Sequence, residues 1–86
     1  IDHLINLEEL DCSYECGISD ENIRNLLNLK KLDCNNNIKI TNIMQLTNLE
    51  ELKCRGCTSI SNSEIESLVK LKFLDVTYNQ HITNLN

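Results

Sequence analysis

Leu49-Glu50-Glu51-Leu52-Lys53-Cys54 is the stretch that decides the fold, because closely related six-residue stretches recur along the chain. The other copies begin at Leu7, Leu29 and Leu71, so successive copies are offset by 22, 20 and 22 residues. A fixed period of this length is the signature of a repeat architecture. The sequence therefore predicts one structural unit per copy, with the units stacked along the chain.

Each copy, counted from its first Leu as position one, has apolar side chains at positions one, four and six. The spacing of two between the last two places both on the inner face of a short strand, with polar residues on the outer face. Turn residues follow, and then an Ile and a hydroxyl residue, which is Ser19, Thr41, Ser61 or Thr83. We expect this hydroxyl residue to cap the N-terminus of a short helix.

The segments behind the hydroxyl residues predict helices over residues 20–27 and 62–69, and Ser61 with Glu64 has the spacing of a capping box. The second copy is two residues shorter, so residues 42–46 are expected to form only a turn of tighter helix.

One strand and one short helix in every 20 to 22 residues, with Leu at these positions, resembles the leucine-rich repeat. Asn37, Cys57 and Asn79 stand three residues after position six, where that family places Asn or Cys. The Ile-Ser/Thr step is most similar to the cysteine-containing class found in F-box-linked proteins. The resemblance implies an α/β solenoid with about four short parallel strands on a concave face and short α or 3-10 helices on a convex face. It also implies that partners bind the concave face.

The repeats predict a single domain over residues 1–86, divided approximately into 7–28, 29–48, 49–70 and 71–86, with 1–6 as the end of a preceding repeat. The pattern is incomplete at both ends, which we interpret as a segment of a longer array. Each terminal layer then exposes Leu and Ile, which favours end-to-end self-association.

The first repeat has Glu15 where Asn or Cys is expected. Either Cys16 turns inward instead, or Glu15 faces water.

The composition narrows the class of protein. The chain has 86 residues, with 41% hydrophobic and only 3% aromatic, so its interior must be built from Leu, Ile and Val. A net charge of -5 with scattered basic residues argues against nucleic acid and anionic membranes as partners. The sequence shows no apolar run of membrane-spanning length and no signal peptide, and its five Cys are an odd number. We therefore expect a cytoplasmic protein with reduced thiols. The 13 Asn, without Ala or Pro, resemble the usage of A/T-rich genomes such as those of some protists or giant viruses.

Cys54 and Cys57 have the Cys-x-x-Cys spacing of a redox site or half a zinc site. Their repeat positions explain both as small core groups, with Cys54 in a column with Cys12 and Cys34. No second pair supports zinc, and no catalytic motif is present. We expect no cofactor, no metal and no enzymatic activity.

Charges at two outer positions alternate in sign from copy to copy. Position two carries Glu8, Lys30, Glu50 and Lys72, and position three carries Glu9, Lys31, Glu51 and Phe73. In-register parallel strands would place opposite charges side by side, which fixes register. Asn37 and Asn79 are expected to bond to backbone groups in the turns.

The remaining outward residues are the candidate partner-binding set, which includes two of the three aromatic residues and Arg55. Aromatic and Arg side chains most often dominate interfaces. The sequence therefore favours a non-catalytic protein-interaction scaffold. The alternative is a substrate-recognition segment of an F-box-type ubiquitin-ligase adaptor, and a redox or zinc protein is the weaker third hypothesis. The full candidate set is Tyr14, Asp33, Asn35, Asn36, Lys53, Arg55, Phe73, Asp75, Thr77 and Tyr78.

Overall fold

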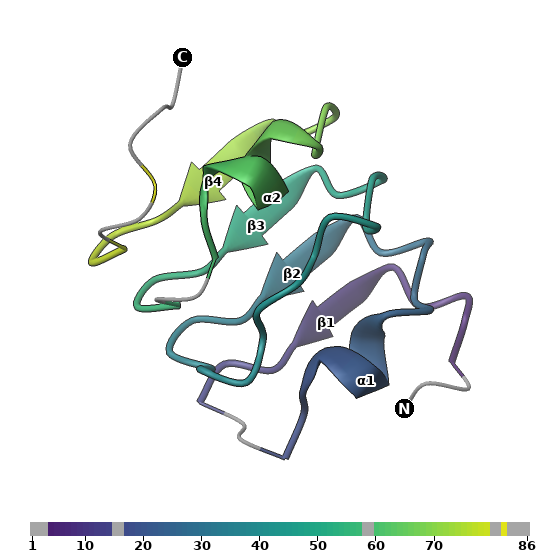
Figure 1. The fold of residues 1–86 in the computed structure, drawn as a ribbon. Helices are drawn as coiled ribbons and strands as arrows, with labels where there is room; N and C mark the ends of the chain where they lie inside the picture. Colours follow the sequence, from purple (N-terminus) through teal and green to yellow (C-terminus); the bar gives the residue numbers. More distant parts are fainter. Residues whose placement is uncertain (1–3, 15–16, 58–59, 80–81, 83–86) are drawn as a thin grey trace.

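The computed structural model describes residues 4–14, 17–57, 60–79 and 82. Within these ranges, four short strands form one parallel sheet in the order of the sequence (Figure 1). Every copy of the six-residue stretch supplies one of them, as predicted. The strands are β1 (Glu9–Asp11), β2 (Lys31–Asp33), β3 (Glu51–Lys53) and β4 (Phe73–Asp75).

The register of the sheet pairs equivalent repeat positions. Leu10 is opposite Leu32, Leu32 opposite Leu52, and Leu52 opposite Leu74. Each strand has three residues, at positions three to five, but backbone bonds between copies continue past the strands. The Lys30 amide, for example, donates to the Glu8 carbonyl at 2.7 Å. Copies of unequal length therefore stack with their strands in register, and the extra residues are accommodated elsewhere in the repeat.

The core lies on one side of the sheet and is filled from positions one, four and six. Leu32 and Leu52 in the two middle strands, and Cys34 and Cys54 directly after them, are at most 2% exposed. Leu10 and its equivalent in β4 are only partly buried. Among the residues that the structure describes, apolar side chains in the outer layers have a neighbouring strand of the sheet on one side alone, and this accounts for the difference.

The two helices, α1 (Asp20–Ile23) and α2 (Asn62–Glu66), are shorter than the predicted 20–27 and 62–69. Ser61 and Glu64 form the predicted capping box. A second capping box, between Ser19 and Asn22, was not predicted. In the ranges that the structure describes, no helix has the length and apolar character needed to cross a membrane.

A period of three residues explains why the helices stop early. From the second repeat into the first residues of the third, the buried residues are spaced three apart, and several backbone amides donate to carbonyls three residues back. A side chain at every third position stays inward through successive tight turns, whereas an α-helix of 3.6 residues per turn would rotate it away from the core. These buried residues are Cys34, Asn37, Ile40, Ile43, Leu46, Leu49 and Leu52.

The second repeat forms turns at residues 44–45 and 47–48 in place of a helix. The prediction that Thr41 caps a helix is therefore wrong. Its amide instead donates to the Asp20 carboxylate of the preceding repeat at 2.8 Å, and its hydroxyl donates to the same carboxylate. Thr83, as well as the alternatives for Glu15 and Cys16, lies outside the described residues.

Candidate functional site

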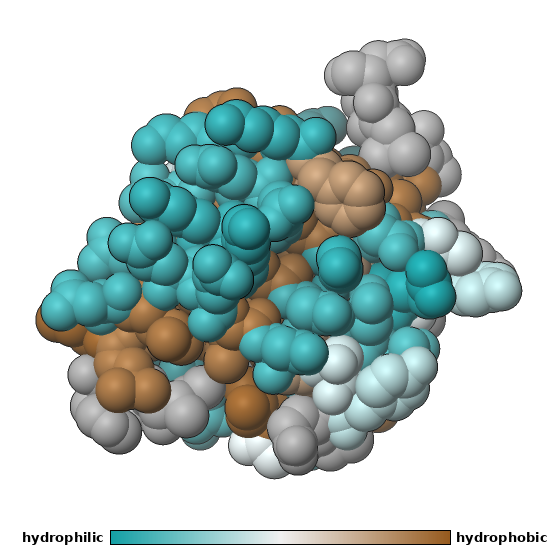
Figure 2. All heavy atoms as spheres, turned by 180° about the vertical axis from the view of Figure 1, so that it is seen from behind, coloured by the Kyte–Doolittle hydropathy of each residue, from teal (hydrophilic) through white to brown (hydrophobic). Residues whose placement is uncertain are grey.

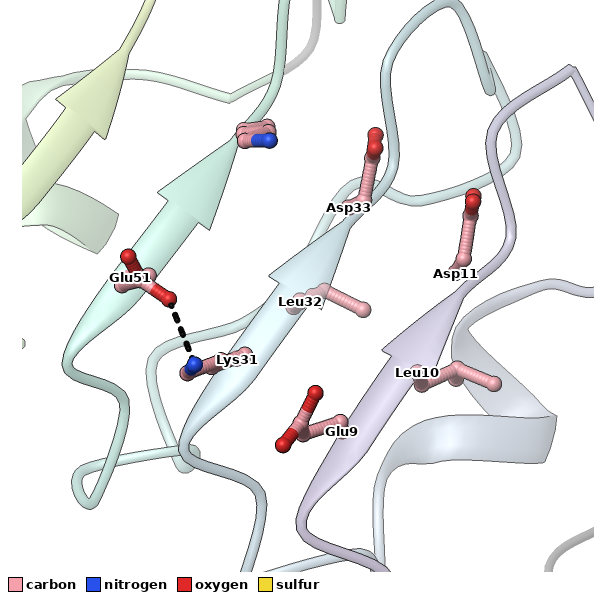
Figure 3. A pocket seen from close by; sticks show the side chains of 8 residues that line it. Glu9, Leu10, Asp11, Lys31, Leu32, Asp33 and Glu51 are labelled. Atoms are coloured by element: carbon pink, nitrogen blue, oxygen red, sulfur yellow. Dashed lines mark ion pairs between the residues drawn. The ribbon is translucent and has the colours of Figure 1, made fainter.

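The candidate site is the outer face of the sheet, defined here as the face that carries positions three and five, opposite the core. A groove of about 380 Å³ lies on it over β1, β2 and β3 (Figure 3). Seen from this side, hydrophilic side chains gather in two zones with a hydrophobic strip between them (Figure 2). The groove is lined by Glu9, Leu10, Asp11, Lys31, Leu32, Asp33, Glu51 and Lys53.

The alternating charges pair across the strands as predicted. Lys31 Nζ lies 3.3 Å from Glu51 Oε2 in the groove. At position two, Lys30 lies 3.7 Å from Glu8, and Lys72 lies 3.5 Å from Glu50. The hydrogen bond with Glu51 raises the pKa of Lys31. These side chains are largely exposed, so each pair adds little to stability and serves mainly to fix register.

Position five carries an Asp in three of the four strands, and each Asp fixes the turn that follows it. Oδ1 of Asp11 accepts the Ser13 amide at 3.0 Å, and Oδ1 of Asp33 accepts the Asn35 amide at 3.1 Å. These are Asx turns, in which the side chain replaces a backbone acceptor. Hydrogen bonds from Ser13 also lower the pKa of Asp11. The turns that follow these strands therefore hold both carboxylates in place at this edge of the groove.

Asp75 has the same role in β4 and also joins two repeats. Its Oδ1 accepts the Thr77 amide at 3.1 Å, while its Oδ2 lies 3.0 Å from Arg55 Nη2. Hydrogen bonds from Thr77 lower its pKa, with a smaller contribution from Arg55. Where β3 has Lys53 in place of Asp, Asn35 of the preceding repeat accepts the Arg55 amide at 2.7 Å. Four of the candidate residues thus form one connected edge.

Position eight has a left-handed backbone in every repeat. The φ angles are 59° at Tyr14, 59° at Asn36, 71° at Gly56 and 64° at Tyr78. Gly and Asn adopt this conformation readily, but a Tyr there is strained. Both Tyr side chains are nevertheless 74% or more exposed. Residues held in strained conformations concentrate at functional sites.

The structure brings most of the predicted set together, but not all of it. Phe73 of β4 is opposite Glu51, and Lys53 is opposite both Asp33 and Asp75. Phe73 is 48% exposed and lies on β4, the strand that also carries Asp75. Tyr14 follows β1, three strands away from Tyr78, which is about 14 Å at the usual strand spacing. The candidate face is therefore a row across all four strands.

Sequence reasoning missed four charged residues that line the groove. Three of them, Glu9, Lys31 and Glu51, were assigned only a register role. The fourth, Asp11, occupies the same repeat position as Asp33, Lys53 and Asp75. A comparison of equivalent positions would have added it to the set.

The buried Cys57 interacts with Cys34 of the preceding repeat, a contact that the Cys-x-x-Cys spacing of Cys54 and Cys57 does not predict. Cys57 Sγ donates to the Cys34 carbonyl at 2.8 Å and lies 3.8 Å from Cys34 Sγ. Cys12, Cys34, Cys54 and Cys57 are all free thiols with no exposed surface. Burial raises the pKa of Cys12 to about 11 and that of Cys54 to about 12. In the described part of the chain, no group of three or more His, Cys, Asp or Glu side chains could hold a metal ion.

The sheet and repeat geometry define the fold of a leucine-rich-repeat protein. A solved leucine-rich-repeat protein of Leptospira interrogans superposes on the whole chain with a TM-score of 0.59 and 20% sequence identity. The chain spans 32% of the length of that protein. No protein-family model matches the chain, and no curated protein matches it. The similarity therefore describes the fold alone.

Proposed function

We propose that the chain is a non-catalytic protein-interaction module that binds a partner through the outer face of its sheet. In this proposal the repeats form a solenoid, the outer face is its concave side, and the short helices lie on the convex side. The observation that carries the proposal is the groove on this face, which is lined largely by charged side chains that the core does not use, with Phe73 exposed on the neighbouring strand β4. Sites that bind partners are usually presented by a rigid scaffold in this way.

Two features of the face support a binding role. Turn hydrogen bonds hold the Asp side chains, which reduces the conformational entropy lost when a partner contacts them. Phe73, Tyr78 and Arg55 are residue types that carry most of the free energy at protein interfaces. Phe73 and Tyr78 are both substantially exposed and lie at the same end of the face.

In the same proposal, the chain divides into repeat units over residues 7–28, 29–48, 49–70 and 71–86. These units belong to the cysteine-containing class of leucine-rich repeats. It also places the protein in the cytoplasm. The four buried free thiols support a reducing compartment, where unpaired cysteines are common.

The test begins with selection of a peptide binder from a random library against the whole chain. Its affinity is then measured by calorimetry for the parent, for a Phe73→Ala, Tyr78→Ala variant, and for a control. Loss of two aromatic anchors should weaken binding by about 2 kcal/mol or more, which is roughly thirtyfold in Kd.

The control is a Met44→Ala, Val69→Ala variant, which removes two exposed apolar side chains from the segments between the strands. We expect it to bind as the parent does. Equal affinity of the parent and the Phe73→Ala, Tyr78→Ala variant would reject the proposed face, as would a loss confined to the control.

A further inference from the structure

The outer face is electrically asymmetric from β1 to β4. The acidic side chains of β3 and β4 are paired with basic ones, because Glu51 is paired with Lys31 of β2 and Asp75 is paired with Arg55. On the β1 and β2 side, Asp11 and Asp33 stand opposite each other in register. No Lys or Arg within the described ranges forms an ion pair with either of these two carboxylates. The groove therefore has an acidic end over β1 and β2.

The negative charge at this end is not required by the fold. Like charges directly opposite on neighbouring strands are destabilising. An amide oxygen can hold the same kind of turn, because Asn35 accepts the Arg55 amide where β3 has no Asp. Asn at positions 11 and 33 would thus keep the turns and remove the repulsion. The retained charge points to a cationic ligand between the two carboxylates.

The other end of the face fits an apolar group. Phe73 is half-exposed on β4, opposite Glu51, whose charge is already paired with Lys31. Lys53 of β3 lies opposite Asp33, on the side of the groove toward β4, and repels a cation from that part of the face. The gap between Asp11 and Asp33 lies two and a half strand spacings from β4, about 12 Å. Phe73 is also two residues further back along its strand, which makes the separation about 14 Å.

We propose that the groove takes an extended segment of a partner protein with a Lys or Arg side chain between Asp11 and Asp33. A bulky apolar side chain four residues along the segment packs against Phe73. Four residues of extended chain cover about 13 Å, and side chains four apart point to the same face. This inference rests on the proposed function and specifies the chemistry of the partner.

The first test is a nuclear magnetic resonance titration with synthetic pentapeptides that have blocked ends. The probe has Lys first, Phe fifth and Ser between them. Two comparison peptides have Glu in place of Lys, or Lys and Phe only two positions apart. We expect the probe to bind at least about fivefold more tightly than either comparison peptide, because only the probe places opposite charge and apolar surface at both ends.

The second test uses two double variants of equal net charge. Asp11→Asn, Asp33→Asn keeps both turn acceptors, whereas Glu21→Gln, Glu66→Gln removes two exposed charges from the helices. The first variant should bind the probe about fivefold more weakly than the parent, and the second should bind as the parent does. Thermal unfolding of the first variant checks that its fold is retained.

Equal weakening in both double variants would show that net charge alone attracts the probe, and would overturn the inference. Equal binding of the Lys and Glu peptides would do the same. If a library-selected binder still depends on Phe73 and Tyr78 but not on Asp11 and Asp33, the proposed function stands and this inference fails. The two proposals are therefore separable.

Discussion

At the scale of single residues, position eight shows how one backbone angle constrains the sequence. Gly56 has a φ of 71°, and a Cβ added there would lie 2.5 Å from Asn36 Oδ1. Two exposed Tyr residues, Tyr14 and Tyr78, have nearly the same angle. Their side chains make this backbone conformation strained, whereas Gly adopts it without strain. In the first three repeats this angle accompanies a bond between repeats, because the amides of Tyr14, Asn36 and Gly56 each donate to a carbonyl of the next repeat.

Gly56→Ala should lower the free energy of unfolding by about 1–2 kcal/mol, because Ala is strained at positive φ and its Cβ displaces the Asn36 side chain. Gly17 provides the matched control, since no atom lies within 4 Å of an added Cβ there. Gly17→Ala should leave stability unchanged or raise it by up to about 1 kcal/mol. Urea unfolding of both variants measures the difference. Equal effects at the two glycines would contradict the role of position eight.

At the scale of elements, the sequence predicted the strands and their pairing correctly, but it did not predict the length of the helices between them. Period-two spacing and the repeat offsets predicted the parallel pairing, because Leu and Cys at positions four and six have only one buried face to occupy. The helices were predicted too long because Ile23 and Leu26 fit both a helical face and a three-residue turn period. The burial of Leu29, three residues further on, distinguishes the two.

The candidate site was predicted in part for a similar reason. Position in the repeat identified the outward residues, including Phe73 and Arg55. The groove and the paired state of each charge depend on side-chain conformation. The repeat register places Lys31 between Glu9 and Glu51, and either could have been its partner. The structure shows that Lys31 forms its ion pair with Glu51.

The side chain of Asn37 links two consecutive repeats through hydrogen bonds, so its substitution measures how much this link contributes to stability. Its Nδ2 donates to the carbonyls of Cys12 and Ile18, and its Oδ1 accepts the Lys39 amide, all within 3.0 Å. Asn37→Ala leaves these buried groups without that partner and should cost about 3 kcal/mol or more.

Asn37→Cys is the informative comparison, because Cys57 occupies the equivalent position and donates to the Cys34 carbonyl. We expect this variant to be about 1 kcal/mol more stable than Asn37→Ala, since a thiol can replace one of the lost donors. Chemical denaturation distinguishes the two. An Asn37→Ala variant as stable as the parent would contradict the role of the Asn side chain as a link between repeats.

At the scale of the whole molecule, the two ends of the sheet differ from its middle. Leu4 is 43% exposed, Ile5 is 56% exposed, and Leu10 is only partly buried, whereas the middle layers are almost fully enclosed. We propose that these apolar layers support end-to-end association of two copies of the chain. Surfaces of this kind are normally covered in repeat proteins by a further repeat or a polar cap.

Light scattering over a wide concentration range tests this association. The molar mass should rise with concentration both with and without reductant, because apolar contact needs no thiol chemistry. A Leu4→Lys, Ile5→Lys variant should remain monomeric, since charge on the end layer opposes its burial. A constant monomer for the parent would contradict the proposal. Growth only without reductant would assign the association to thiol oxidation instead.

The most direct test of the central claim, that the outer face of the sheet binds a partner, is amide chemical-shift mapping of the whole chain with the library-selected peptide. The predicted result is that perturbed amides lie in β1 to β4 and at the turn residues Asn35, Arg55 and Thr77. Amides of α1 and α2 should remain unchanged. Perturbations concentrated in the helices and the tight turns between strands would contradict the claim, because the partner would then bind the opposite side of the molecule.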